Sequence, residues 1–334
     1  MHTKRVTVEE AVALLQQGQV VAFPTETVYG LGADATSDQA VARIFAAKGR
    51  PADNPLIVHI GHIEQLPQVA ADVPDTAKAL MDAFWPGALT VILPKQAGLS
   101  PSVTAGLDSV GVRLPSDPVA LALLRGVSLP IAAPSANVSG RPSPTTAEHV
   151  AEDLDGKVAG ILDGASAQIG LESTVIDCTV TPPIILRPGG VTREAIEAVI
   201  GPVDVAQPET DQETAPKSPG MKYTHYAPKA PMAIVKGDPA FFRRVIADAQ
   251  AKGKRVGVLV AQESRYAYPA DVVLTCGTRQ DAATVAQELY HVLREFDRQD
   301  VDVIYGESFD EDGLGAAIMN RLRKASGYQV IEQG

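Results

Sequence analysis

The stretch Gln19–Ala35, QVVAFPTETVYGLGADA, contains the first strand that the sequence predicts and the loop that follows it. Gln19–Phe23 is a short apolar run, and Pro24 ends it because proline cannot donate a hydrogen bond to a sheet. In the predicted loop, two threonines flank Glu26, and two glycines permit the close approach of another backbone or of a ligand. An ordinary connection from a strand to a helix has the same composition, so this loop by itself does not establish a binding site.

Beyond this loop, helices alternate with short strands as far as about residue 202. Asp38 is placed to cap a helix that brings Val41, Ile44 and Phe45 to one face. This mixture predicts an α/β domain over residues 1–202, built on an open, twisted, mixed sheet. Further helices are predicted near 75–84, 117–125 and 146–154. Apolar runs predict strands at Leu56–Ile60, Leu89–Leu93, Val110–Leu114, Ile131–Ala133, Gly160–Leu162, Thr174–Asp177 and Ile184–Arg187.

Residues 203–230 differ from the sequence on either side, because they are polar, contain four prolines and lack an apolar period. This composition predicts a linker. The end of the linker, MKYTHYAPKA at 221–230, is aromatic and basic, which is unusual for a simple spacer.

Residues 231–334 return to an ordered pattern. Strands are predicted at Arg255–Val260 and Val301–Tyr305, among helices near 239–252, 281–298 and 314–325. The β-α-β-α order predicts a smaller, Rossmann-like α/β domain. No motif in this domain carries chemistry by itself, so we expect it to act in packing or in positioning a lid.

Composition excludes several classes of protein. Of 334 residues, 29 are Lys or Arg and 40 are Asp or Glu, so the formal net charge is −11 and bulk charge does not favour nucleic acid. Two cysteines cannot form a disulfide framework or a four-thiolate zinc site. The N-terminus lacks the apolar stretch of a signal peptide, and no apolar run reaches the length of a membrane span. We therefore expect a soluble, cytoplasmic protein without membrane contact.

Common catalytic signatures are absent from the sequence. It contains no phosphate-binding GxxxxGK[ST] loop, no complete GxGxxG, no HExxH and no GxSxG. His59 and His62 form an HxxH pair, but a zinc site needs further ligands that the sequence does not indicate. We therefore predict no metal bound by protein side chains.

Four cations lie beside predicted strands or helix ends: Lys48, Arg50, Arg113 and Arg187. Lys48 and Arg50 suit a solvated helix C-terminus as well as a ligand site. Arg113 lies within an apolar strand, where its charge requires either a salt bridge or an anionic ligand. Together, the four cations predict a cavity that neutralises a polyanion such as a triphosphate.

The segment APSANVSGRPSP, positions 133–144, adds short polar side chains on a backbone rich in proline. Ser135, Asn137, Ser139 and Ser143 suit sugar or phosphate oxygens, although turn chemistry explains the same residues. Reasoning from the residues alone thus reaches a nucleotide-binding protein without a phosphate-binding loop and without an evident nucleophile.

In these segments the chain closely resembles the YrdC-type threonylcarbamoyl-AMP synthase family, in its longer two-domain form. The motifs FPTETVYGLGA, KGRP..NPLIVH, FWPGALT, SVGVRLP, APSANVSG, ESTVID and LRPGG occur in the family's order. The linker end SPGMKYTHYAP also resembles that form, and the resemblance covers essentially the whole chain.

The resemblance implies that the enzyme condenses L-threonine, bicarbonate or CO2, and ATP into threonylcarbamoyl-adenylate, with release of pyrophosphate. It implies a YrdC-like sheet with a concave cavity, and Mg²⁺ carried with ATP. Separate transferase proteins would then pass the threonylcarbamoyl group to tRNA, which this protein would meet only indirectly.

The resemblance also implies roles for particular residues. The linker end would form a lid over the nucleotide. The residues implied for catalysis are Lys48, Arg50, Ser135 and Asn137. Those implied for threonine are Thr27, His59, Arg113, Ala133 and Ser173. Those implied for ATP are Arg50, Asn54, Ser109, Ser135, Ser143, Arg187 and Tyr226.

Three other functions fit the same fold. The protein could be a tRNA-binding module, although its net charge and lack of stacked aromatics argue against this. It could be a hydrolase or carbamoyltransferase related to hydrogenase-maturation proteins, but the zinc-finger and acylphosphatase-like regions of those proteins are absent. It could also be a regulatory nucleotide binder, which threonine-dependent pyrophosphate release would exclude.

Overall fold

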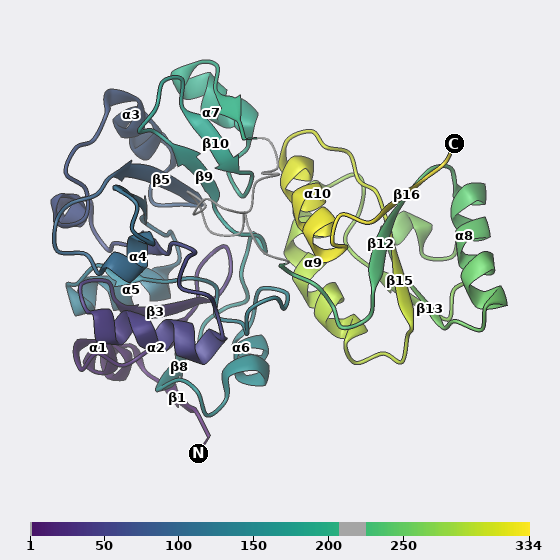
Figure 1. Cartoon of the computed structure of the whole chain (residues 1–334), viewed down its shortest axis with the longest axis horizontal. Coiled ribbons are helices and arrows are strands. Elements are labelled where there is room, and N and C mark those ends of the chain that lie inside the picture. Colours follow the sequence, from purple (N-terminus) through teal and green to yellow (C-terminus); the bar gives the residue numbers. More distant parts are fainter. Residues whose placement is uncertain (1, 207–224) are drawn as a thin grey trace. The chain divides into compact units, whose positions relative to one another are not determined.

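The computed structural model describes residues 2–206 and 225–334, which form two compact units. The first unit holds most of residues 2–206 (Figure 1). The second holds residues 225–334 together with the short segments Gly140–Pro142 and Ile169–Leu171. Most of the predicted linker, residues 203–230, lies outside the described residues.

The first unit is built on a mixed sheet, as expected for a YrdC-like fold. It has eleven strands, three more than the eight that the sequence predicts. Its order is β1-β8-β2-β3-β7-β4-β6-β5-β9-β10-β11, and parallel and antiparallel pairs both occur. The last strand, β11, extends the sheet to residue 205. The strands are β1 (Lys4–Val6), β2 (Val21–Phe23), β3 (Gly30–Asp34), β4 (Ile57–His59), β5 (Leu89–Pro94), β6 (Ser109–Arg113), β7 (Ile131–Ala132), β8 (Gly160–Leu162), β9 (Thr174–Asp177), β10 (Ile184–Arg187) and β11 (Asp204–Val205).

Strand β3 lies in a segment for which the sequence predicted a loop. It pairs with β2 in antiparallel register, with Val21 opposite Gly32 and Phe23 opposite Gly30. A Cβ atom at Gly32 would lie 2.8 Å from the ring of Phe23. The glycines therefore make room for a buried aromatic ring inside the sheet, which is a tertiary effect that strand propensity does not reveal.

Local signals place most helices of the first unit. Thr7 and Glu10 form a capping box at the start of the first helix. The cap of the second helix is Ser37, not Asp38 as predicted, because the Ser37 hydroxyl accepts the backbone N–H of Ala40. The helices are α1 (Val8–Gln16), α2 (Asp38–Lys48), α3 (Asp75–Phe84), α4 (Pro101–Thr104), α5 (Pro118–Val127), α6 (Ala147–Leu154) and α7 (Arg193–Ile200), with a 3-10 helix η1 (Ile63–Gln68).

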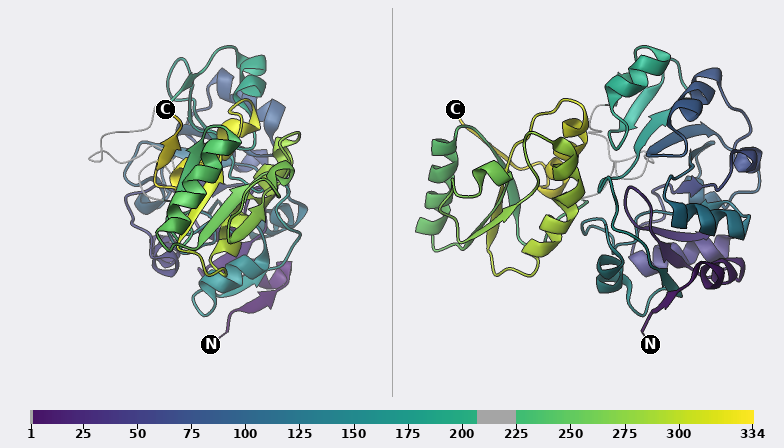
Figure 2. Two further views of the ribbon diagram at one scale, coloured as in Figure 1. Left: turned by 90° about the vertical axis from the view of Figure 1, so that its right-hand side faces the viewer. Right: turned by 180° about the vertical axis from the view of Figure 1, so that it is seen from behind.

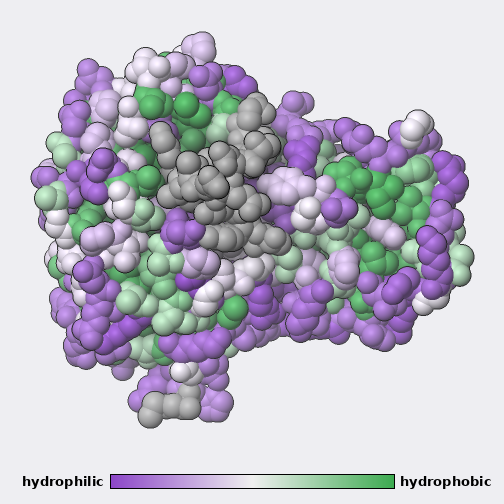
Figure 3. All heavy atoms as spheres, in the orientation of Figure 1, coloured by the Kyte–Doolittle hydropathy of each residue, from purple (hydrophilic) through white to green (hydrophobic). Residues whose placement is uncertain are grey.

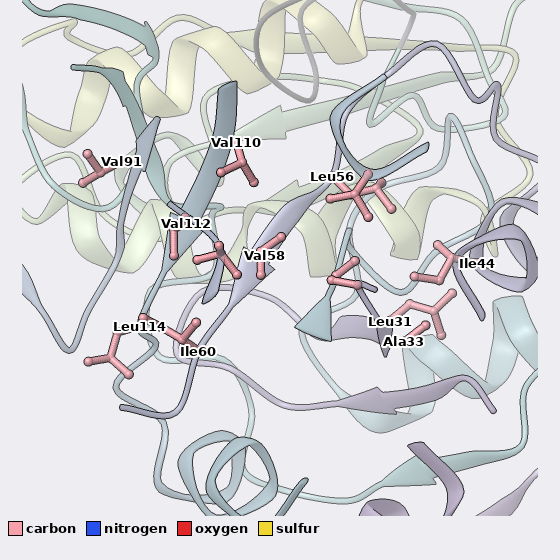
Figure 4. Close-up of a cluster of buried hydrophobic side chains, with 14 of the residues drawn as sticks. Leu31, Ala33, Ile44, Leu56, Val58, Ile60, Val91, Val110, Val112 and Leu114 are labelled. Carbon is pink, nitrogen blue, oxygen red and sulfur yellow. The ribbon is translucent and has the colours of Figure 1, made fainter. Parts of the chain in front are cut away.

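Two apolar clusters cover different parts of the sheet. The main core lies on one face, where Val58, Val110 and Val112 meet side chains of α2, α3 and α7 (Figure 4). A second core packs α1 and α5 against β2, β7 and β8. The side chains of β4 and β6 that alternate with the core residues therefore point to the opposite face of the sheet. That face carries the polar residues described below.

The second unit contains a five-stranded parallel sheet of order β14-β13-β15-β12-β16, which confirms the smaller parallel α/β domain. Helix α8 packs on one face, and α9 and α10 cover the other (Figure 2). The sequence did not predict three of its strands, β12, β14 and β16. The strands are β12 (Met232–Lys236), β13 (Val256–Val260), β14 (Val272–Thr275), β15 (Val303–Glu307) and β16 (Val330–Glu332). The helices are α8 (Pro239–Ala251), α9 (Ala282–Phe296) and α10 (Leu314–Ala325), with a 3-10 helix η2 (Gln262–Ser264).

The surface of the second unit shows apolar atoms over the region of β12 and β16 (Figure 3). Val330 on the edge strand β16 is one of the exposed apolar side chains. The strand is three residues long, and Glu332 on it lies 3.7 Å from Lys236 of β12. A short edge with charges disfavours pairing with further strands. Among the described residues, no helix combines the length and apolarity that crossing a bilayer requires.

Candidate active site

The sheet face opposite the main core brings together two residues that are predicted to bind threonine. Strands β4 and β6 are parallel neighbours, and their register pairs His59 with Arg113. Because side chains alternate along a strand, Ser109, Gly111 and Arg113 share the face opposite the core residues of β6. His59 and Arg113 therefore end adjacent strands side by side on this face.

The guanidinium of Arg113 is held on three sides. Its Nε donates to the carbonyl of Gly87 at 3.2 Å, and its Nη1 donates to Thr27 Oγ1 at 2.8 Å. Its Nη2 lies 2.7 Å from Glu26 Oε1, and both side chains are buried. The structure thus supplies the salt bridge that the sequence left open, while the role of Arg113 toward a ligand stays a prediction.

The charges of the neighbouring groups follow from this arrangement. Burial raises the pKa of a carboxyl group, but the charge and hydrogen bond of Arg113 outweigh it, so the pKa of Glu26 falls below its usual value. Burial and then the charge of Arg113 lower the pKa of His59 to about 3. At neutral pH the site therefore holds an ionised Glu26 and a neutral imidazole.

The hydroxyl groups of Thr25 and Thr27 form a directed chain. Thr25 Oγ1 donates to the carbonyl of Val28 at 2.6 Å, so its single proton is used. The two hydroxyl oxygens are 2.9 Å apart, and their shared proton must therefore come from Thr27. Thr27 can offer a ligand only a lone pair, which suits an ammonium or hydroxyl donor.

Ser173 and Arg187 connect the residues predicted for threonine and for ATP. The hydroxyl of Ser173, just before β9, lies 2.7 Å from Thr90 Oγ1 on β5. Arg187, at the end of β10, donates to the carbonyl of Ser173 from Nε at 3.2 Å and from Nη2 at 2.9 Å. The buried Arg187 side chain thus fixes the backbone at Ser173, which is predicted to contact the threonine substrate.

Lys48 is buried, so the solvated helix end considered from the sequence is wrong for this residue. Its Nζ donates to the carbonyls of Ser135 and Asn137, the latter at 2.7 Å, and lies 3.4 Å from Asn137 Oδ1. The Ser135 hydroxyl also donates to Asn137 Oδ1 at 2.6 Å. Lys48 therefore holds the loop that carries Ser135 and Asn137.

Arg50 and Asn54 lie close together after the end of α2. Gly49 ends the helix in the left-handed conformation, with φ of 62°, and the Arg50 side chain reaches the carbonyls of Asn54 and Pro55 at 3.3 and 3.2 Å. Both polar atoms of the Asn54 amide are buried and meet no hydrogen-bond partner within the described residues. A ligand with one donor and one acceptor would satisfy this amide, because a buried polar group left unpaired costs about 1–3 kcal/mol.

The other residues predicted for ATP and threonine occupy separate places. Ser143 is buried and donates to Glu172 Oε1 at 2.6 Å. Ala133 is buried, and its N–H donates to the carbonyl of Ile57. Ser109 opens β6 beside a small hollow whose lining also includes Leu56, Ile57, Ile92, Val103 and Val175.

Tyr226 lies in the second unit. It is buried, with φ of 66°, and its ring lies 5.2 Å from the ring of Tyr290 and under the guanidinium of Arg321. Residues 220–224 of the predicted lid lie outside the described residues.

Among residues 2–206 and 225–334, no group of three or more His, Cys, Asp or Glu side chains could hold a metal ion. His59 is buried on β4, and His62 is exposed at the start of η1.

Sequence reasoning did not assign roles to three polar residues on this face. Glu26 contacts Arg113, Thr90 contacts Ser173, and Glu172 contacts Ser143. All three lie within the motifs quoted from the sequence, so position in a motif was the available signal. Their partners are distant in sequence and are apparent only in the fold.

Comparison with known proteins identifies the family of this chain. A family model described as telomere recombination matches residues 13–189, and one described as threonylcarbamoyl-AMP synthase, C-terminal domain, matches residues 191–327. The threonylcarbamoyl-AMP synthase of Bacillus subtilis (strain 168) is 57% identical over 332 residues, which span 99% of this chain and 96% of the relative. The chain belongs to the threonylcarbamoyl-AMP synthase family.

Further members of the threonylcarbamoyl-AMP synthase family are also similar to this chain. The enzyme of that name from Pyrococcus abyssi is 51% identical over 324 residues, covering 96% of this chain and 94% of the relative. The crystal structure of P. abyssi Sua5 complexed with L-threonine matches with a TM-score of 0.93 and 47% identity, covering 100% of this chain and 99% of that one. A double-alanine variant of P. abyssi Sua5 matches with a TM-score of 0.92 at 48% identity, covering 98% and 94%.

Proposed function

We propose that this protein synthesises L-threonylcarbamoyl-AMP from L-threonine, bicarbonate or CO2, and ATP, and releases pyrophosphate. The observation that carries the proposal is the buried cluster of Thr27, His59 and Arg113 on the sheet face opposite the main core. It occurs in a full-length relative of threonylcarbamoyl-AMP synthases, one of which has been solved with L-threonine.

L-Threonine would bind beside Arg113. A guanidinium has five N–H groups. The described hydrogen bonds of Arg113 use one on Nε and one on Nη1, and Nη2 forms the ion pair with Glu26, which leaves N–H groups on Nη1 and Nη2 for a carboxylate. The free lone pair of Thr27 suits the ammonium or hydroxyl of the amino acid. His59, Ala133 and Ser173 would complete the pocket.

ATP would bind toward Lys48, Arg50 and the loop 135–137, with Mg²⁺ held by its phosphate oxygens. Arg50, Asn54, Ser109, Ser135, Ser143 and Arg187 would contact the nucleotide. The catalytic contribution of Lys48 and Asn137 would be to hold Ser135 in place.

The reaction then needs orientation and neutralisation of charge. The amine of threonine adds to CO2 and loses a proton, or combines with bicarbonate and releases water, to form a carbamate. A carbamate oxygen then attacks the α-phosphorus of ATP as the bond to pyrophosphate breaks. Both attacking and leaving groups are anionic, so cations positioned before reaction lower the barrier, and no side-chain nucleophile is required.

Tyr226 and the linker end would close over the nucleotide and exclude water from the mixed anhydride. Separate transferases would use the product to modify tRNA, and the reaction would take place in the cytoplasm.

The test is pyrophosphate release by the purified full-length chain with each substrate omitted in turn. We expect release only when ATP, L-threonine and bicarbonate are all present, with L-serine in place of L-threonine as the control for side-chain recognition. Equal ATP turnover without threonine would contradict the proposal. Salt-dependent tRNA binding without ATP turnover would instead favour an RNA-binding module.

A further inference from the structure

Glu26 is a buried charge beside the proposed threonine pocket that the reaction above does not use. It is 5% exposed, and its Oε1 lies 2.7 Å from Arg113 Nη2. Within the described part of the chain, Arg113 is its only ion-pair partner. A buried ion pair adds little net stability because desolvation of both charges offsets their attraction, so stability alone does not account for it.

The other contacts of Arg113 leave a specific task for Glu26. Gly87 and Thr27 offer neutral acceptors to Nε and Nη1, whereas Glu26 is, among residues 2–206 and 225–334, the one charged partner, at Nη2. An arginine side chain has many rotamers, and fixing all three nitrogen atoms selects one orientation. The N–H groups that remain on Nη1 and Nη2 are then presented in a defined plane.

The loop that carries Glu26 is itself locked. Thr25 Oγ1 accepts the backbone N–H groups of Thr27 and Val28, both at 3.2 Å, and donates to the carbonyl of Val28. This closed turn contains Glu26. The carboxylate is therefore presented to Arg113 from a fixed backbone.

Resting on the proposed function, we propose that Glu26 is a positioning residue that orients the Arg113 guanidinium to receive the carboxylate of the amino-acid substrate. Glu26 acts through Arg113 and does not take the proton of the substrate amine. The depressed pKa of Glu26 agrees with a permanent charge partner.

The test compares the variant Glu26→Gln with the unchanged full-length enzyme. Glutamine keeps the shape of the side chain and removes its charge. We expect the KM for L-threonine to rise about tenfold or more, while the KM for ATP changes by less than about threefold. In an Arg113→Lys background, Glu26→Gln should add less than about threefold to the KM for threonine, because residues that act through one another are not additive.

Glu197→Gln is the matched control. It removes a partly exposed Glu–Arg pair, with Arg193 Nε 2.9 Å from Glu197 Oε1 on α7, and should change neither KM. Should Glu26→Gln fail to fold, Glu26→Asp keeps the charge but shortens its reach, and we expect a smaller rise confined to the KM for threonine.

The outcomes separate this proposal from the proposed function. Unchanged enzyme that releases no pyrophosphate in response to threonine contradicts the function. If the unchanged enzyme runs the reaction but the Glu26 variant has a normal KM for threonine, only the role of Glu26 is contradicted. The same holds if the KM for threonine and the KM for ATP rise together. Full additivity with Arg113→Lys also contradicts it.

Discussion

The ammonium of Lys48 lies 2.7 Å from the carbonyl oxygen of Asn137, and it also donates to the carbonyl of Ser135 in the same short loop. A helix end and a loop that are far apart in sequence are thereby fixed to each other inside the first unit. The Lys48 ammonium therefore holds the protein backbone in place, so its removal should affect stability as well as activity.

Lys48→Ala should reduce both stability and activity. The substitution leaves the carbonyls of Asn137, which is buried, and of Ser135, which is partly buried, without this donor, at about 1–3 kcal/mol for each group left unsatisfied. Arg50→Ala, the neighbouring control, should reduce activity with a much smaller loss of stability because Arg50 is only partly buried. Thermal melting combined with pyrophosphate release measures both effects. Equal melting temperatures for the two variants would contradict the holding role of Lys48.

Arg113→Lys should raise the KM for L-threonine far more than that for ATP. Lysine keeps the charge but cannot bond in three directions and still present two parallel N–H groups. Steady-state kinetics with each substrate varied separately provides the measurement. Equal changes in the KM for L-threonine and the KM for ATP would place Arg113 outside the amino-acid pocket. A large fall in melting temperature with normal kinetics would mean that the ion pair of Arg113 with Glu26 has a purely structural role.

His59 should make the protein less stable as the pH falls. Its pKa is lowered to about 3 in the fold from 6.5, so the unfolded chain binds more protons between these values and stability decreases with decreasing pH. The expected loss is about 1–2 kcal/mol between about pH 6.5 and 5.

Urea unfolding followed by the fluorescence of Trp85, the single tryptophan, reports on the first unit. In His59→Gln this part of the pH dependence should disappear, whereas in His291→Gln, at an exposed position of α9, it should persist. An unchanged slope in His59→Gln would show that other groups cause the effect.

Gly111 should limit the size of the site. A Cβ atom there would lie 3.2 Å from Thr90 Cγ2 and 3.6 Å from Ile57 Cγ1, on the face between Ser109 and Arg113. Gly111→Ala should therefore reduce activity modestly, and Gly111→Val should reduce it about tenfold or more while the strand is retained, since valine favours strands. Circular dichroism and kinetics test this series. Full activity in Gly111→Val would exclude substrates from this part of the face.

Limited proteolysis should distinguish a lid from a tether. Tyr226 is buried, so chymotrypsin should cut after it slowly with or without substrates. We expect ATP with L-threonine to slow tryptic cleavage after Lys222. Cleavage after Lys222 that is equally fast in both conditions would indicate a tether.

The sequence predicted the alternating strands of the main core because Val110 and Val112 follow a period of two. It did not predict β3, because the glycines of that strand have low strand propensity and are explained only by the ring of Phe23. The candidate site was predicted from motifs, but the pairing of Glu26 with Arg113 joins residues 87 positions apart and depends on the fold. Burial of Lys48 was likewise invisible, since charge at a helix end usually indicates solvent.

The directed hydroxyl chain from Arg113 through Thr27 and Thr25 to Val28 has a spectroscopic consequence. Hydroxyl protons normally exchange with water too quickly for detection, but both of these are buried and bonded. They should give observable, slowly exchanging resonances in a nuclear magnetic resonance spectrum. A new donor placed on the free lone pair of Thr27 would shift these resonances, so the molecule carries its own reporter of pocket occupancy.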